Sequence, residues 1–157
     1  MNWEAAGAVG EIIGAIAVVA TLIFLAIQLR HSTQATQNNA WQDITRILSD
    51  LNVTEVTDPD LSSFIQLAER EPSELTEDQY WKIARIAETR IAAFESAFLA
   101  SSKGTIGTYY WDALLPYALQ TMRKPGYVKF WGKSKHDVYH PEFVNFIDSA
   151  VGERGPD

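Results

Sequence analysis

Two pairs of residues have the types and spacing that could support chemistry, and the first is a pair of histidines. His136 and His140 lie four residues apart, with Asp137 between them. On a helix this spacing places two imidazoles on one face, as metal sites require. Pro141, however, disfavours helical geometry at the residue before it, and no second pair of ligands is evident. We therefore interpret His140 as the cap of a following helix and predict no metal site.

The second pair is Glu88 and Glu95, seven residues apart and close in sequence to Arg85 and Arg90. Two inward carboxylates could act as a general acid and a general base. The same spacing equally suits surface ion pairs, such as Arg85 with Glu88. The sequence has no nucleophile–base pair, phosphate-binding glycine loop or zinc motif. We predict no catalytic residue and no cofactor, and keep a ligand site beside the two glutamates as an alternative.

A third feature is a carboxylate at the start of an apolar run. Residues 12–29 contain Gln28 as their only strongly polar side chain, and Glu11 directly precedes them. As a helix this run is about 27 Å long, close to the ~30 Å hydrocarbon core of a bilayer. We therefore predict that residues 1–30 form a transmembrane anchor helix and that residues 31–157 form a separate helical domain.

Small residues surround Glu11 at helical spacing. Together with the carboxylate they form one predicted face of the anchor: Ala6, Gly7, Gly10, Glu11, Gly14 and Ala15. Such spacing lets a second helix approach closely, so we predict that this face packs against another membrane helix. Two alternatives remain for Glu11. It could reach the lipid headgroups from an interfacial position, or it could handle protons or ions.

The sequence on either side of the apolar run indicates a retained anchor. A cleaved signal needs a basic segment before a short apolar run, whereas residues 1–4 contain no Lys or Arg. Arg30 and His31 follow the run, and Glu4 precedes it. The positive-inside rule then places the N-terminus outside and the C-terminal domain in the cytoplasm.

Start and stop signals divide the rest of the chain into helices. Helical periodicity continues the first helix to about residue 53. Asp58-Pro59 is a helix start, and Thr76 to Gln79 forms a capping box. After the first helix, which ends at about residue 53, we expect four further helices. These cover residues 59–70, residues 77 to before 104, residues 107–122 with a kink at Pro116, and a last helix that begins at residue 141. A turn at Pro125-Gly126 and a short aromatic segment complete an all-α bundle of four or five helices.

Charge is segregated along the chain. The formal net charge of −7 argues against a nucleic-acid partner. Residues 43–78 contain ten acidic side chains, whereas residues 123–135 contain five cations and no acid. This basic segment contains the candidate lipid or partner contacts Arg123, Lys124, Lys129, Trp131, Lys133 and Lys135. Its aromatic residues could instead belong to the core, or its cations could meet the acidic block of a neighbouring molecule.

The N-terminal pattern W-E-x-x-G-x-x-G-E-x-x-G, residues 3–14, resembles a broad group of uncharacterised bacterial single-span membrane proteins with a helical cytoplasmic domain. Asp58-Pro59, Pro125-Gly126 and Pro141-Glu142-Phe143 extend the likeness over nearly the whole chain. Pro116 and His140 depart from the pattern. The resemblance implies a location in the bacterial inner membrane, and it brings no activity, catalytic residue or cofactor.

These observations favour a non-enzymatic small integral membrane protein. We expect it to self-assemble, or to dock as an accessory or structural subunit of a larger membrane complex, through its small-residue transmembrane face. Its expected partners are membrane lipid, further copies of itself or other membrane subunits. The alternatives are a membrane-tethered enzyme or small-ligand sensor, and an ion- or proton-conducting oligomer that uses Glu11.

Overall fold

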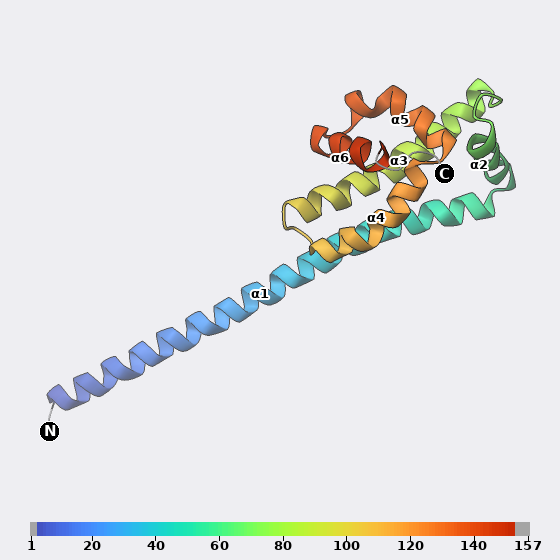
Figure 1. Ribbon diagram of the computed structural model, residues 1–157. Helices are drawn as coiled ribbons and strands as arrows, with labels where there is room; N and C mark the ends of the chain where they lie inside the picture. The colour runs from blue at the N-terminus through green and yellow to red at the C-terminus, as the bar shows by residue number, and fades with distance from the viewer. Residues whose placement is uncertain (1–2, 153–157) are drawn as a thin grey trace. The chain divides into compact units, whose positions relative to one another are not determined.

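The computed structural model describes residues 3–152, apart from the side chains of residues 3–6, 8–10, 12 and 13. This part of the chain consists of helices and contains no strand (Figure 1). The helices in chain order are α1 (Trp3–Thr57), α2 (Pro59–Arg70), α3 (Glu77–Ser102), α4 (Thr108–Met122), α5 (Pro125–Val138) and α6 (Pro141–Gly152). The prediction of an all-α chain is confirmed over these residues. Internal contacts divide the chain into two compact units, Met1–Asn39 and Ala40–Asp157.

The first unit contains the N-terminal part of α1. Between Ile16 and Leu29 its large apolar side chains are 51% to 70% exposed. The polar hydroxyl of Thr21 donates to the carbonyl of Ala17 at 2.8 Å, so it is satisfied within the helix. By length and composition this is a helix that could cross a membrane. Its most apolar stretch of 18 residues has a mean hydropathy of 1.7, and none of these residues is buried. A helix that is apolar on all sides is normally buried, either in the core of a protein or in a membrane.

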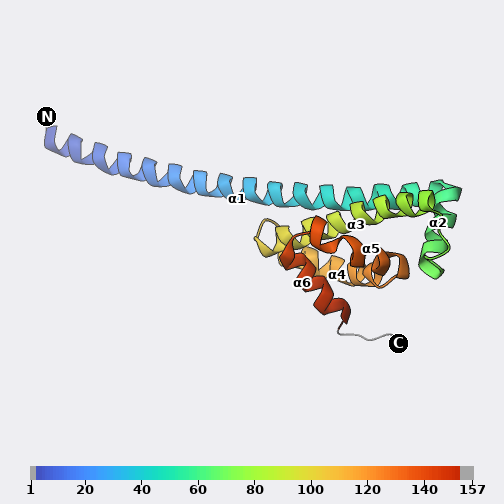
Figure 2. The same cartoon turned by 90° about the horizontal axis from the view of Figure 1, so that it is seen from above.

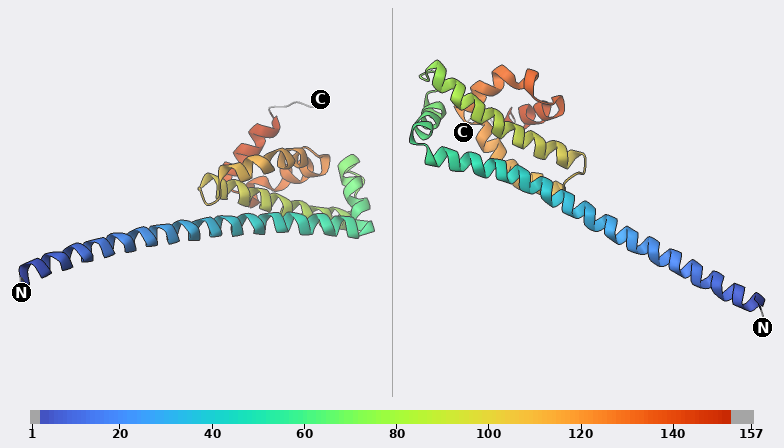
Figure 3. Two further views of the ribbon diagram at one scale, coloured as in Figure 1. Left: turned by 90° about the horizontal axis from the view of Figure 1, so that it is seen from below. Right: turned by 180° about the vertical axis from the view of Figure 1, so that it is seen from behind.

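The second unit has one apolar core, and α3 is its central element. The core side chains Ile91 and Phe94 of α3 and Phe143 of α6 are completely buried. α3 contacts α2, α4, α5 and α6. Figures 2 and 3 show α2 and α6 at opposite ends of this unit. The C-terminal part of α1 adds Ile44 and Leu48 to the same core.

Three of the predicted helix starts are confirmed by their caps. Asp58 accepts hydrogen bonds from the backbone amides of Asp60 and Leu61 at the start of α2, each at 3.0 Å. Thr76 and Gln79 form the predicted capping box, with bonds of 3.0 and 3.3 Å. The Nδ1 atom of His140 accepts from the amide of Glu142 at 3.3 Å, so His140 caps α6 as expected. These caps satisfy amides that have no partner inside the helix.

Pro125-Gly126 begins a helix, where we expected a turn followed by a short aromatic segment. Pro125 occupies the first helical position of α5, for which its fixed φ is well suited. Gly126 lies against α2: a Cβ atom at this position would be 3.0 Å from the carbonyl oxygen of Ala68. The absent side chain therefore permits close contact between α5 and α2. A different glycine, Gly104, has a φ of 70° after the end of α3, a conformation that glycine adopts without strain.

α4 contains Pro116 in its interior, and the helix extends from Thr108 to Met122 across it. Its inner face consists of Trp111, Leu114 and Ala118, which belong to the main core. The ring of Tyr117 meets that of Phe94 edge-on, with the two centroids 5.7 Å apart. The interface between α3 and α4 is thus filled with apolar and aromatic side chains.

Candidate functional site

The predicted packing face of the anchor is open where the structure describes it. Glu11 and Ala15 are exposed. A Cβ atom at Gly7 or Gly14 would meet no other atom within 4 Å. The surroundings of the other two members of this face, Ala6 and Gly10, are outside what the structure describes. The described positions therefore leave room for a second helix beside Glu11.

The cations of the basic segment mostly contact this same chain. Lys124 forms an ion pair with Glu69 of α2, with the Nζ and Oε1 atoms 2.5 Å apart. Lys129 donates to the carbonyl of Pro72 at 2.8 Å. The ammonium groups of Lys129 and Lys133 lie 5.6 and 4.8 Å from the ring centroid of Tyr80. The acidic block and the basic segment therefore meet within one molecule, where α5 packs against α2. Contact of these cations with lipid or with a partner stays a prediction.

The aromatic residues of the basic segment are core residues. Tyr127, Phe130 and Trp131 are all buried. The indole Nε1 of Trp131 donates to Asp148 of α6 at 2.8 Å, and Lys135 pairs with the other carboxylate oxygen at 2.5 Å. Burial opposes the ionisation of Asp148, but hydrogen bonds from Lys135 and Trp131 outweigh it and hold the pKa of Asp148 below its usual value.

A buried arginine joins three helices. Arg90 of α3 is 5% exposed. Its Nη2 donates to Glu55 at 2.6 Å and to Asn52 at 3.1 Å, both on α1, and its Nη1 donates to the Tyr127 hydroxyl at 2.7 Å. Burial raises the pKa of Tyr127 to about 12 even though Arg90 acts in the opposite direction, so this phenol is neutral at physiological pH. The group is a structural link between helices, because a buried guanidinium requires its ionic and hydrogen-bonding partners.

The role of Arg90 was not predicted, although its position in the sequence indicated a buried charge. Arg90 lies three residues after Ala87 and four before Phe94, within the apolar stripe of α3. A charged residue in that stripe must find partners or leave the core. What the sequence could not supply is the identity of the partners, because Glu55 and Tyr127 are 35 and 37 residues away.

Glu88 and Glu95 have local partners. Glu88 pairs with Arg85 at 2.5 Å, as expected for residues three apart on a helix. Glu95 accepts from the backbone amide of His140. Tyr139 lies near both glutamates; burial and then these two charges raise its pKa above the ordinary value. Its buried hydroxyl has no hydrogen-bond partner in the described part of the chain. A ligand site at these carboxylates stays a prediction.

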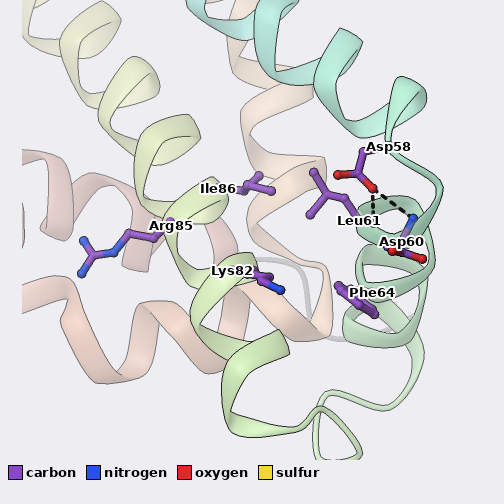
Figure 4. A pocket seen from close by; sticks show the side chains of 7 residues that line it. All are labelled: Asp58, Asp60, Leu61, Phe64, Lys82, Arg85 and Ile86. Carbon is purple, nitrogen blue, oxygen red and sulfur yellow. Dashed lines mark hydrogen bonds between the residues drawn. The ribbon is translucent and has the colours of Figure 1, made fainter.

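A groove lies between α2 and α3, and its cavity volume is about 470 Å³ (Figure 4). Its lining consists of Asp58, Asp60, Leu61, Phe64, Lys82, Arg85 and Ile86. Leu61 is buried, and Phe64 and Ile86 are half-buried, which makes the floor apolar. This groove could not be predicted from the sequence, because it depends on how two helices that are separate in sequence pack together.

Neither a metal cluster nor a match to a known protein identifies the chain. In the part of the chain that the structure describes, no group of three or more His, Asp or Glu side chains is placed to hold one metal ion. Comparison with protein-family models, with curated proteins and with solved structures finds no match. The likeness to bacterial single-span proteins therefore stays a prediction, and the function has to be argued from the geometry.

Proposed function

We propose that this chain is a non-enzymatic, single-span membrane protein that self-assembles or docks as an accessory subunit of a larger membrane complex. Residues 1–30 are the anchor, and a bundle of helices in the cytoplasm follows it. The anchor lies in the bacterial inner membrane with its N-terminus outside. The observation that carries this proposal is the exposed apolar surface between Ile16 and Leu29, because a surface of this size in water marks a membrane or protein contact.

The small residues beside Glu11 support the assembly part of the proposal. Lipid tails are as apolar as the helix, so association in a membrane depends on close packing and on polar contacts. Gly7 and Gly14 leave the helix backbone accessible on the side that carries Glu11. A second helix on this face gives the Glu11 carboxyl group a hydrogen-bond partner, which lowers the cost of holding it near the hydrocarbon.

The mass of the particle extracted in a mild non-ionic detergent tests the assembly. We expect a discrete multimer, or a complex with other membrane subunits, for the wild type. Gly14→Leu should break it up, because a leucine side chain prevents close approach of the helices. Ala20→Leu is the matched control: it enlarges another small residue of the same segment, about 120° around the helix from Gly14.

The proposal fails if the wild type is a monodisperse monomer. It also fails if Gly14→Leu and Ala20→Leu leave the particle mass equally unchanged. Equal disruption by the two substitutions would assign assembly to the apolar segment in general and would contradict a specific role for the face that carries Glu11.

A further inference from the structure

The groove between α2 and α3 has an excess of negative charge. Lys82 is the ammonium group at its edge, and its Nζ pairs with Asp78 at 2.8 Å. The carboxylates of Asp58 and Asp60 also act on this one ammonium group, and together with Asp78 they raise the pKa of Lys82. Arg85 does not offset the excess, because its guanidinium points away from the other lining side chains (Figure 4) and pairs with Glu88. Lys82 and Arg85 are each paired with a carboxylate outside the lining, so the lining carboxylates Asp58 and Asp60 give the groove its excess of negative charge.

The floor of the groove sets the second requirement for an occupant. Leu61, Phe64 and Ile86 present apolar surface at the base of a cavity of about 470 Å³, and the charged side chains at its edge are exposed. An occupant must supply apolar groups to the floor and positive charge to the edge.

A helix with one apolar and one basic face meets both requirements. Amphipathic helices bind in grooves through apolar side chains spaced three or four residues apart. This chain's own basic helix, α5, is already packed against α2, α3, α4 and α6. The basic helix of this chain is therefore not available to the groove, and the occupant that we consider is a helix of a partner protein.

We propose that this groove binds a basic amphipathic helix of a partner protein. Apolar side chains of that helix contact Leu61, Phe64 and Ile86. A lysine or arginine next to them pairs with Asp58 or Asp60 at the edge. The inference goes beyond the proposed function, since it names a partner class for the helical domain and does not depend on what the apolar segment of α1 contacts.

Binding of a model peptide to the full chain in non-ionic detergent tests the inference. The probe is a fluorescent Leu/Lys amphipathic peptide of about 15 residues, near the length at which isolated helices become stable. A Leu/Glu peptide with the same pattern is the control probe. We expect saturable binding of the Leu/Lys peptide, measured by fluorescence polarisation, and none of the Leu/Glu peptide.

Two substitutions locate the binding site. Asp60→Lys should weaken binding about fivefold or more, as expected for losing and reversing one exposed ion pair. Asp112→Lys changes the net charge by the same amount on exposed α4 surface and should leave binding unchanged. Phe64→Ala should also weaken binding, although it leaves every charge unchanged. If Asp60→Lys does not fold, Phe64→Ala and Asp60→Asn test the site in its place. Equal weakening by Asp60→Lys and Asp112→Lys, or equal binding of the two peptides, would overturn the inference.

Discussion

The Nη2 atom of Arg90 lies 2.6 Å from the Oε1 atom of Glu55, and this contact joins α3 to α1 across the core of the helical domain. The two side chains are 6% and 18% exposed, respectively. An ion pair of this kind makes little net contribution when both partners are present, but the loss of one leaves a buried charge without compensation. The pair therefore fixes the position of the C-terminal part of α1 against α3.

Glu55→Gln should destabilise the domain because it leaves the Arg90 guanidinium uncompensated. We expect a loss of about 2–4 kcal/mol in the free energy of unfolding, measured by denaturant titration of the full chain in detergent. Glu88→Gln is the matched control, since it breaks the exposed pair with Arg85 and should cost less than about 1 kcal/mol. Equal effects of the two substitutions would contradict a structural role for Arg90.

Gly126→Ala should destabilise the contact between α5 and α2. The added Cβ atom would lie 3.0 Å from the carbonyl oxygen of Ala68, which belongs to the backbone and cannot move aside easily. We expect a loss of about 1–3 kcal/mol. Gly132→Ala, in the same helix and with no atom within 4 Å of the new Cβ, should instead stabilise the protein by about 0.5–1 kcal/mol through helix propensity. Thermal unfolding of the two variants side by side measures the difference, and effects of the same sign would refute the close-contact explanation.

Asp148 should make the stability of the domain depend on pH in the acid range. The pKa of Asp148 is below its usual value in the folded state. As the pH decreases, the unfolded chain therefore binds a proton at a higher pH than the folded chain does, and the free energy of unfolding decreases. The contribution is complete above a pH of about 4, the ordinary pKa of an aspartate, and is lost as the pH falls through the folded-state pKa. Asp148→Asn should therefore lower the unfolding midpoint at neutral pH and have less effect near the acid limit. A difference from the wild type that stays constant with pH would contradict this role; Asp112→Asn on the exposed surface is the control.

Local signals in the sequence predicted most of the helices, because caps and prolines act over three or four residues. Asp58, Thr76 and His140 each cap the helix that the sequence predicts. Pro125-Gly126 begins α5 and does not form the predicted turn. Both residue types favour turns, but they also suit a helix start that packs closely. Only the position of Ala68, 58 residues before Gly126, distinguishes the two.

The candidate sites were less predictable because they depend on contacts between distant residues. The sequence shows ten acids in residues 43–78 and five cations in residues 123–135, but not that Glu69 and Lys124 meet within one molecule. The groove beside Asp60 likewise exists only once α2 packs against α3. By contrast, the apolar surface between Ile16 and Leu29 could be predicted, because it requires no partner within the chain.

The most direct test of a membrane anchor at residues 1–30 is the intact mass of the protein that stays in the membrane after alkaline carbonate extraction. We expect the chain to resist extraction and its mass to show that residues 1–30 are retained. Leu22→Arg, which places a charge in the middle of the apolar run, should release a substantial fraction, because a central arginine costs about 2.5–3.5 kcal/mol or more in a bilayer. A chain that is extracted into the soluble fraction, or a mature protein that lacks residues 1–30, would contradict the assignment of a membrane anchor.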